Sequence, residues 1–213
     1  MSDVAVRPRA AGTLDVSRDR LVIAASTVGT IFEWYDFFVY GTLAAIIGQQ
    51  FFPASSPTAQ FLLALASFGV GFGVRPLGAA LFGYLGDRLG RKHTFLITIT
   101  LMGLATAAVG IVPGFHAIGG AAPVILVLLR VLQGLALGGE YGGAAIYVAE
   151  HAPRDKRGLY TSFIQAGVIG GFLLSLLVVL LSEAFVDQAD WQAWGWRLPF
   201  LFSLLLLAVS LWM

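Results

Sequence analysis

Six long apolar stretches, separated by short polar breaks, constrain this chain more than any other feature. The stretches cover approximately residues 21–48, 59–85, 94–113, 121–149, 159–184 and 197–213. A helix needs about 20 mainly apolar residues to cross the hydrocarbon core of a bilayer. Backbone polar groups in lipid must pair within their own segment, so runs of this length predict helices, and the shorter alternating segments of a β-barrel are missing. We therefore expect an all-α integral membrane protein with a bundle of six transmembrane helices.

The overall composition supports a lipid environment and excludes several classes of protein. Hydrophobic residues make up 58% of the chain and charged residues only 12%, whereas a soluble domain has about 45–50% apolar and about 25% charged residues. The net charge of +1 argues against a nucleic-acid partner, and the absence of cysteine excludes disulfides and thiolate metal sites. The sequence contains no nucleotide-binding, metalloprotease or serine-hydrolase motif, so we expect no enzyme activity and no metal.

The distribution of basic residues predicts the orientation. Ten of the 13 Lys and Arg residues lie in the N-terminal tail and in the breaks after the second and fourth stretches. An even number of crossings separates these segments, so the excess of positive charge places all three in the cytoplasm. We expect residues 1–20 to form a cytoplasmic tail and residues 21–213 to form the bundle, in the inner or plasma membrane. The first stretch contains acidic residues and is followed by five more, which indicates a retained helix rather than a signal peptide.

Three charged residues inside the stretches are candidates for proton coupling. Glu33 and Asp36 are three residues apart in the first stretch and share one face of the helix, while Arg130 lies in the fourth. A charge at the centre of a spanning helix costs about 2.5–3.5 kcal/mol, so such groups usually face the bundle interior or an ion pathway. An acid that alternates between a protonated form and an arginine-paired form is a proton switch. We expect Asp36 or Glu33 to carry the proton with Arg130 as partner; a purely structural ion pair is the alternative.

A second arginine, Arg75, lies in the second stretch and has two interpretations. It either binds an anionic substrate or pairs with Glu140 or another acid. Tyr40 extends the face of the two acids, and Gln133 lies on nearly the same stripe as Arg130. The candidate substrate-binding residues are Arg75, Tyr40, Gln133 and Glu140.

Glycine recurs at four-residue spacing in the fourth stretch, at Gly134, Gly138 and Gly142. Small residues at this spacing let the backbone of another helix approach closely. We interpret the row as a packing surface, which brings Arg130 close to a neighbouring helix.

The break after the second stretch carries a recognisable signature. Residues 83–92 read GYLGDRLGRK and match the pattern G-x-x-x-D-R-x-G-R-[RK] at every fixed position. This pattern resembles the loop after helix two in the major facilitator superfamily. Other segments resemble the metabolite:H⁺ symporter family within it: EWYDFFVYG (33–41), RPLG (75–78), LQGLALGGEYGGA (132–144), EHAP (150–153) and WGWRLPF (194–200).

The resemblance implies a fold and a function. It implies the N-terminal half of a major facilitator fold, built from two inverted three-helix repeats, in a symporter that moves small organic acids or zwitterions by alternating access. A proton gradient drives such transport without a cofactor. By its place in the motif, Asp36 matches the family's coupling acid better than Glu33 does. The resemblance also implies a cytoplasmic gate formed by Gly83, Asp87, Arg88, Gly90, Arg91 and Glu150.

The family has twelve helices in two halves, whereas the present sequence ends at Met213, inside the sixth predicted helix. We therefore expect a bundle that is truncated within helix six and that needs a C-terminal half or a second copy as its partner. The alternative is a membrane component that does not transport, or a half-transporter that assembles with itself or with a partner half.

Overall fold

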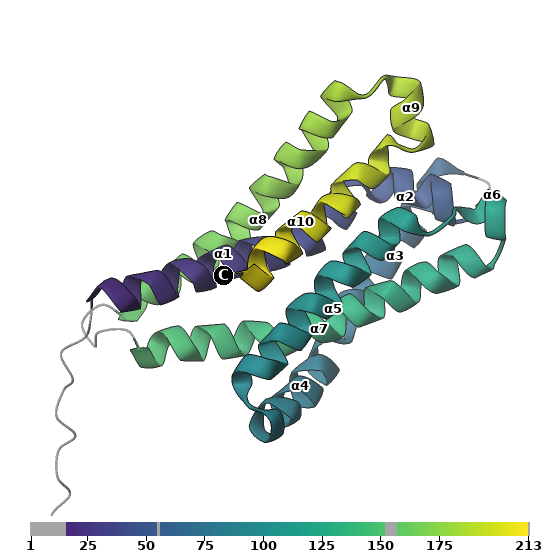
Figure 1. Ribbon diagram of the computed structural model, residues 1–213. Coiled ribbons are helices and arrows are strands. Elements are labelled where there is room, and N and C mark those ends of the chain that lie inside the picture. Colours follow the sequence, from purple (N-terminus) through teal and green to yellow (C-terminus); the bar gives the residue numbers. More distant parts are fainter. Residues whose placement is uncertain (1–15, 55, 152–156, 213) are drawn as a thin grey trace, which may run out of the picture.

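A computed structural model describes residues 16–54, 56–151 and 157–212, without the side chains of residues 16–26, 91–92 and 140–151. The described part is almost entirely helical, which confirms the predicted all-α class (Figure 1). The elements are α1 (Val16–Thr42), α2 (Ala44–Phe51), α3 (Pro57–Gly73), α4 (Arg75–Leu89), α5 (Arg91–Ile111), α6 (Phe115–Ile118), α7 (Ala121–His151), α8 (Arg157–Phe185), α9 (Gln188–Ala193), the 3₁₀ helix η1 (Gly195–Arg197) and α10 (Leu198–Trp212).

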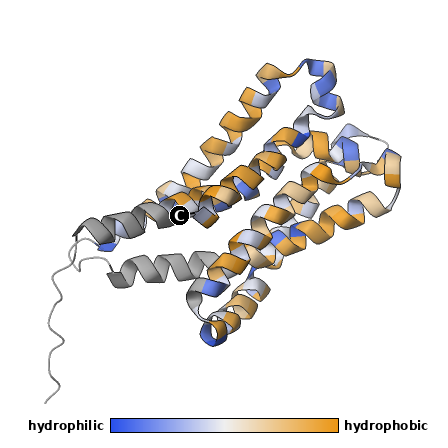
Figure 2. Ribbon diagram, in the orientation of Figure 1, coloured by the Kyte–Doolittle hydropathy of each residue, from blue (hydrophilic) through white to orange (hydrophobic). Residues whose placement is uncertain are grey.

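The six predicted stretches correspond to α1 with α2, α3 with α4, α5, α7, α8, and η1 with α10. When only the described residues are counted, five of these six segments are long and apolar enough to cross a membrane. The segment outside that set is α1, for which the side chains of residues 16–26 are not among those described. The described part of this helix includes residues 16–20, which precede the predicted apolar stretch. Hydrophobic residues cover the long helices, and hydrophilic ones gather at α9 and at the end of α4 (Figure 2).

The second crossing segment is bent between α3 and α4. The backbone N–H of Val74 donates to the Val70 carbonyl at 3.2 Å, and that of Gly78 donates to the Val74 carbonyl at 3.1 Å, so the helical path continues. Pro76 has no backbone N–H and cannot complete the ladder, which explains the break. The bend places Arg75 at the first position of α4, inside the segment rather than at its end.

The helices pack in pairs that reflect an internal repeat. Helix α1 lies along α8, α4 lies along α7, and α5 lies along α10. The first, second and third crossing segments correspond in order to the fourth, fifth and sixth. Under this correspondence, the contact of α1 with α8 is equivalent to the contact of α7 with α3 and α4, and the contact of α5 with α10 is equivalent to itself. Two three-helix repeats produce this arrangement.

The glycine row of α7 forms one of these contacts. A Cβ atom at Gly134 would lie 2.1 Å from the Gly71 carbonyl oxygen, and one at Gly138 would lie 2.1 Å from the Arg75 carbonyl oxygen. The backbones of α7 and of the bent α3–α4 segment therefore touch, which confirms the packing interpretation of these two glycines. The side-chain position of Gly142 lies outside the described residues.

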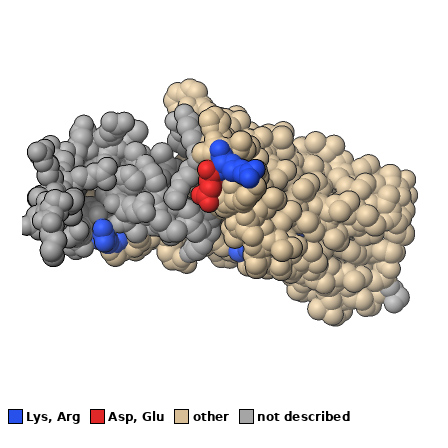
Figure 3. Space-filling view, turned by 90° about the horizontal axis from the view of Figure 1, so that it is seen from below, with Lys and Arg blue, Asp and Glu red and all other residues tan. Residues whose placement is uncertain are grey.

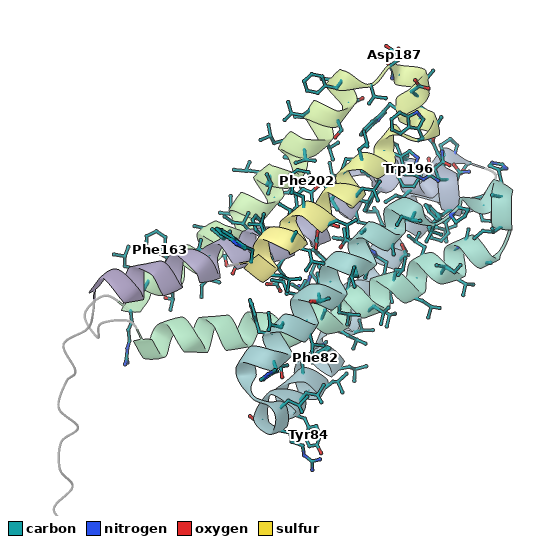
Figure 4. The ribbon with its side chains drawn as sticks, in the orientation of Figure 1. Phe82, Tyr84, Phe163, Asp187, Trp196 and Phe202 are labelled. Atoms are coloured by element: carbon teal, nitrogen blue, oxygen red, sulfur yellow. The ribbon has the colours of Figure 1, made fainter. Side chains whose placement is uncertain are left out.

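Helix α10 closes the bundle against α1 and α5. The Tyr35 hydroxyl donates to the Pro199 carbonyl at 2.6 Å, and the Ser203 hydroxyl donates to the Gly103 carbonyl at 3.2 Å. Near the start of α10, the buried Trp196 packs edge-on against Phe51, so the end of α2 is fixed to the same corner (Figure 4). Helix α1 is thus held by α8 on one side and α10 on the other.

Candidate functional site

The acidic face of α1 points into the bundle. Glu33 and Asp36 are each 5% exposed, although they belong to the most polar part of the spanning region. Their three-residue spacing places both on one face, and this face meets α5 and α7. A buried carboxyl group needs a counter-charge, a proton or hydrogen-bond donors, so the neighbours of each acid decide its chemistry.

Arg130 is the basic neighbour of Asp36. Its side chain, on α7, is 1% exposed and lies close enough to Asp36 for their charges to interact. The Arg130 guanidinium carbon is 4.0 Å from the centre of the Tyr40 ring. Among the described residues, none of its three nitrogens has a hydrogen-bond partner. The guanidinium is therefore held by an aromatic face while its donors stay available.

Tyr40 supports Arg130 from α1. Its hydroxyl forms a short hydrogen bond with the Ser67 hydroxyl on α3, and the Ser67 hydroxyl also donates to the Ala64 carbonyl at 2.7 Å. The ring is fully buried and stacks on Phe68. Tyr40 is thus fixed at both its ring and its hydroxyl.

Gln133 lies one turn beyond Arg130 and connects α7 to α5. Its side-chain amide donates to the Thr106 hydroxyl at 2.6 Å. The Thr106 hydroxyl also approaches the Asp36 carboxyl group. Asp36, Arg130, Gln133 and Thr106 together form a buried polar cluster from three helices.

Arg75 occupies a different environment at the start of α4. Its guanidinium carbon lies 3.9 Å from the centre of the Phe72 ring, 4.4 Å from Phe37 and 5.3 Å from Trp34. We call these three rings the aromatic cage. The acid whose charge acts on Arg75 is Glu33 on α1. Arg75 therefore has an acidic neighbour, as the interpretation of an arginine paired with an acid expects. The side chain of Glu140 lies outside the described residues.

Nε and Nη2 of Arg75 are buried and have no hydrogen-bond partner among the described residues. These two nitrogens form one edge of the guanidinium, the edge that binds a carboxylate with two parallel hydrogen bonds. The rings of the aromatic cage cover the faces of the group and leave this edge without a partner.

The described side chains of the signature, at the end of α4 and the turn into α5, lie mostly at the surface. Asp87 and Arg88 are exposed, and the Arg88 guanidinium carbon lies 4.6 Å from the centre of the Tyr84 ring (Figure 4). Gly90 has a φ of +89°, which favours glycine and turns the chain from α4 into α5. Gly83 is exposed on the last turns of α4. The side chains of Arg91 and Glu150 lie outside the described residues.

Seen from below, charged side chains of both signs gather at one place (Figure 3). Most of the remaining described surface in this view carries no charge. Among the described side chains, the basic and acidic residues other than Glu33, Asp36, Arg75 and Arg130 lie near the ends of helices or in the connections between them.

Comparisons with known proteins identify the family of the chain. The model of a family described as "Sugar (and other) transporter" matches residues 21–213. The chain belongs to this family. It is 48% identical over 202 residues to the shikimate transporter of Escherichia coli (strain K12), across 94% of the chain and 46% of that protein. It is 44% identical over 200 residues to the glycine betaine/proline/ectoine/pipecolic acid transporter OusA of Dickeya dadantii (strain 3937), across 94% of the chain and 40% of that protein.

A solved structure shows the same fold. The proton:xylose symporter XylE, a major facilitator superfamily protein bound to 6-bromo-6-deoxy-D-glucose, superimposes with a TM-score of 0.79 at 22% identity, across 93% of the chain and 45% of XylE. The predicted resemblance to the N-terminal half of a major facilitator transporter is therefore confirmed. The chain spans about half the length of the curated relatives it matches. Members of this superfamily are multi-pass membrane transporters rather than enzymes.

Some residues of this transporter bundle were not predicted from the sequence. Thr106 lies in an apolar stretch with no pattern that marks it, and Ser67 is likewise one small polar residue among apolar ones. Trp34 and Phe37 do fall within the segment EWYDFFVYG, so the family resemblance was the available signal for two of the three rings of the aromatic cage. Phe72 had none.

Proposed function

We propose that this chain forms the N-terminal bundle of a proton-coupled symporter for small carboxylates or zwitterions, which works by alternating access. The observation that supports this most is the buried Asp36 beside Arg130, whose guanidinium nitrogens lack hydrogen-bond partners among the described residues. Ionisable groups in this position inside a membrane protein commonly mark an ion or substrate pathway. The names of the curated relatives, which include shikimate, betaine and alpha-ketoglutarate, support small carboxylates or zwitterions as the class of substrate.

Arg130 offers a simple means of coupling. When Asp36 carries a proton it is neutral, and the guanidinium can bind the carboxylate of a substrate. When Asp36 loses the proton, its own carboxylate competes for the same guanidinium. Proton loss and substrate release are then favoured together, because one cation cannot pair fully with two carboxylates.

Arg75 would supply the second contact for an anionic substrate. Its Nε and Nη2 edge has no partner in the described part, and the aromatic cage keeps the group in place. Tyr40 and Gln133 would support the site around Arg130 indirectly, because the Tyr40 hydroxyl already bonds to Ser67 and the Gln133 side-chain nitrogen already bonds to Thr106. Glu33 would balance the charge of Arg75 when no substrate is bound.

For the cytoplasmic side we propose that Asp87 and Arg91 form a charge network with Glu150, supported by Arg88, around the turns at Gly83 and Gly90. The family signature and the exposed positions of Asp87 and Arg88 support this assignment.

The N-terminus would then be cytoplasmic. Cysteines at Ser56 and His93, both exposed, test the orientation: an impermeant thiol reagent added outside cells should label the first and not the second. The reverse pattern would invert the topology.

The transport experiment uses lipid vesicles that contain the chain together with a complementary six-helix half, and vesicles that contain the chain alone. An inward proton gradient should drive accumulation of ¹⁴C-labelled shikimate, betaine or α-ketoglutarate in the first set. A protonophore should remove the accumulation, since the proton gradient is the energy source and no bound cofactor is involved. Uptake of all three that ignores the gradient would refute the proposal.

A further inference from the structure

Thr106 is a fully buried hydroxyl with three polar neighbours. The hydroxyl accepts a hydrogen bond from the Gln133 side-chain amide at 2.6 Å and donates one to the Met102 carbonyl at 3.0 Å. The Asp36 carboxyl group is the third neighbour. These contacts connect α1, α5 and α7 at one point, and the transport scheme above gives Thr106 no role.

A threonine hydroxyl is both a donor and an acceptor. It has one hydrogen, which rotates, and two lone pairs. The Gln133 amide occupies one lone pair and fixes the oxygen, which leaves the second lone pair for a proton on Asp36. If Asp36 loses its proton, the hydroxyl hydrogen can turn from the Met102 carbonyl to the carboxylate. The Met102 carbonyl still accepts its backbone hydrogen bond within the helix, so the rotation leaves no carbonyl without a partner.

We propose that Thr106 is a positioning residue for the proton carrier: its hydroxyl rotates so that Asp36 keeps a hydrogen-bond partner in both protonation states. This inference rests on the proposed function, because it assumes that Asp36 changes its protonation state. A buried polar group that loses its partner carries a large penalty, and a hydroxyl that can reverse its role avoids this penalty in each state.

Other charged or titratable groups also act on Asp36 and must be separated from the effect of Thr106. In the described part, Arg130 from α7 and Tyr35 from α1 interact electrostatically with Asp36, and Glu33 lies on the same face of α1 three residues away. Helix α5 contributes Thr106 and no charged side chain at this level among its described residues. A variant of Thr106 therefore changes the hydrogen bonding of Asp36 without changing the charges around it.

Thr98 provides a matched control on the same helix. It is 1% exposed, and its hydroxyl donates to the Phe95 carbonyl at 2.9 Å, as Thr106 donates to its own helix. The test compares Thr106→Val, Thr106→Ser, Thr98→Val and the unchanged chain in lipid. Infrared difference spectra follow the carboxyl C=O band with pH, and loss of the band in Asp36→Asn assigns it. Thr106→Ala and Thr98→Ala repeat the comparison if a valine variant fails to fold.

Thr106→Val should shift the midpoint of this titration toward higher pH by about half a unit to one unit, because the hydrogen bond that the carboxylate loses is stronger than the neutral hydrogen bond that the protonated acid loses. Thr106→Ser and Thr98→Val should leave the midpoint unchanged. In vesicles with the complementary half, the pH for half-maximal uptake should follow the same order. Equal midpoints in Thr106→Val, Thr98→Val and the unchanged chain would overturn the inference.

Failure of the proposed function has a different signature. In that case the Asp36 band would titrate and respond to Thr106→Val, but Asp36→Asn would leave proton-driven uptake intact. If Asp36→Asn removes uptake and Thr106→Val changes neither the band nor the pH profile, the proposed function stands and the role of Thr106 is wrong.

Discussion

The two arginines inside the bundle face acids on the same helix, yet their surroundings differ. Arg130 is fully buried beside Asp36, in a cluster that includes the Thr106 hydroxyl and the Gln133 amide. Arg75 is half-buried near Glu33, and its guanidinium lies against the three rings of the aromatic cage.

This difference separates two tasks. Hydroxyl and amide groups can reorganise their hydrogen bonds when a proton is gained or lost. Aromatic faces attract a cation but cannot donate to a carboxylate, so they suit a group whose charge stays constant. The surroundings of Asp36 and Arg130 therefore support the proposed proton switch, and those of Glu33 and Arg75 support the proposed site for a fixed positive charge.

The largest expected effect follows from neutralising the two acids. In a transporter that carries this bundle, Asp36→Asn should abolish accumulation against a gradient yet still allow exchange of substrate across the membrane. Glu33→Gln, the matched change three residues away, should retain accumulation. Uptake and counterflow of labelled substrate measure both activities. If Asp36→Asn still concentrates substrate and Glu33→Gln does not, the proton carrier is Glu33.

A second test concerns the helix contact that sets the distance between the arginines. In Gly134→Ala the new methyl group would meet the Gly71 carbonyl, and backbone atoms cannot easily move aside. Overpacking of this kind costs about 1–3 kcal/mol or more, so the midpoint of thermal unfolding in detergent should fall clearly.

Gly69→Ala is the control for this packing test. Nothing lies within 4 Å of a Cβ atom at Gly69, and alanine favours a helix by about 0.5–1 kcal/mol over glycine. Its unfolding temperature should stay the same or rise slightly. An equal loss in both variants would show that the α7 glycines are not a close contact.

These tests also mark what the sequence could and could not predict. Apolar length predicted the crossing segments, the cost of charge in lipid singled out Asp36 and Arg130, and the four-residue glycine spacing predicted the contact of α7. The acid beside Arg75 depends on the bend at Val74 and on how the helices rotate about their axes, which periodicity does not fix. Thr106 had no signal, because one hydroxyl in an apolar helix usually bonds to its own backbone.

A smaller effect is expected from Arg75→Lys. Lysine keeps the charge but loses the planar group that stacks on the cage and the paired donors of its Nε and Nη2 edge. Loss of a cation–π contact of about 0.5–2 kcal/mol corresponds to a rise in KM for an anionic substrate of about 2- to 30-fold. Arg197→Lys is the control, since Arg197 stacks on Trp196 at 4.3 Å away from both acids. A similar rise in KM in the control would remove the special role of the cage.

The smallest effect is expected from Tyr40→Phe, which separates the two ways in which Tyr40 supports Arg130. The substitution removes the hydrogen bond to Ser67, but the Ser67 hydroxyl still donates to the Ala64 carbonyl, so no buried group loses its last partner. The cost should be about 0.5–1.5 kcal/mol of stability. The phenyl ring can remain beneath the guanidinium, where the tyrosine ring lies at 4.0 Å, so proton-driven uptake should change little.

Tyr40→Leu removes the ring as well and should therefore do more. Arg130 would lose its aromatic support while its nitrogens still have no hydrogen-bond partner among the described residues. Unfolding temperature and uptake rate, measured for both variants, distinguish the two contributions. If Tyr40→Phe reduces uptake as much as Tyr40→Leu, the hydroxyl holds Arg130 in place through Ser67, and the aromatic face makes no separate contribution. The two arginines would then differ more than proposed, because only Arg75 would depend on aromatic rings.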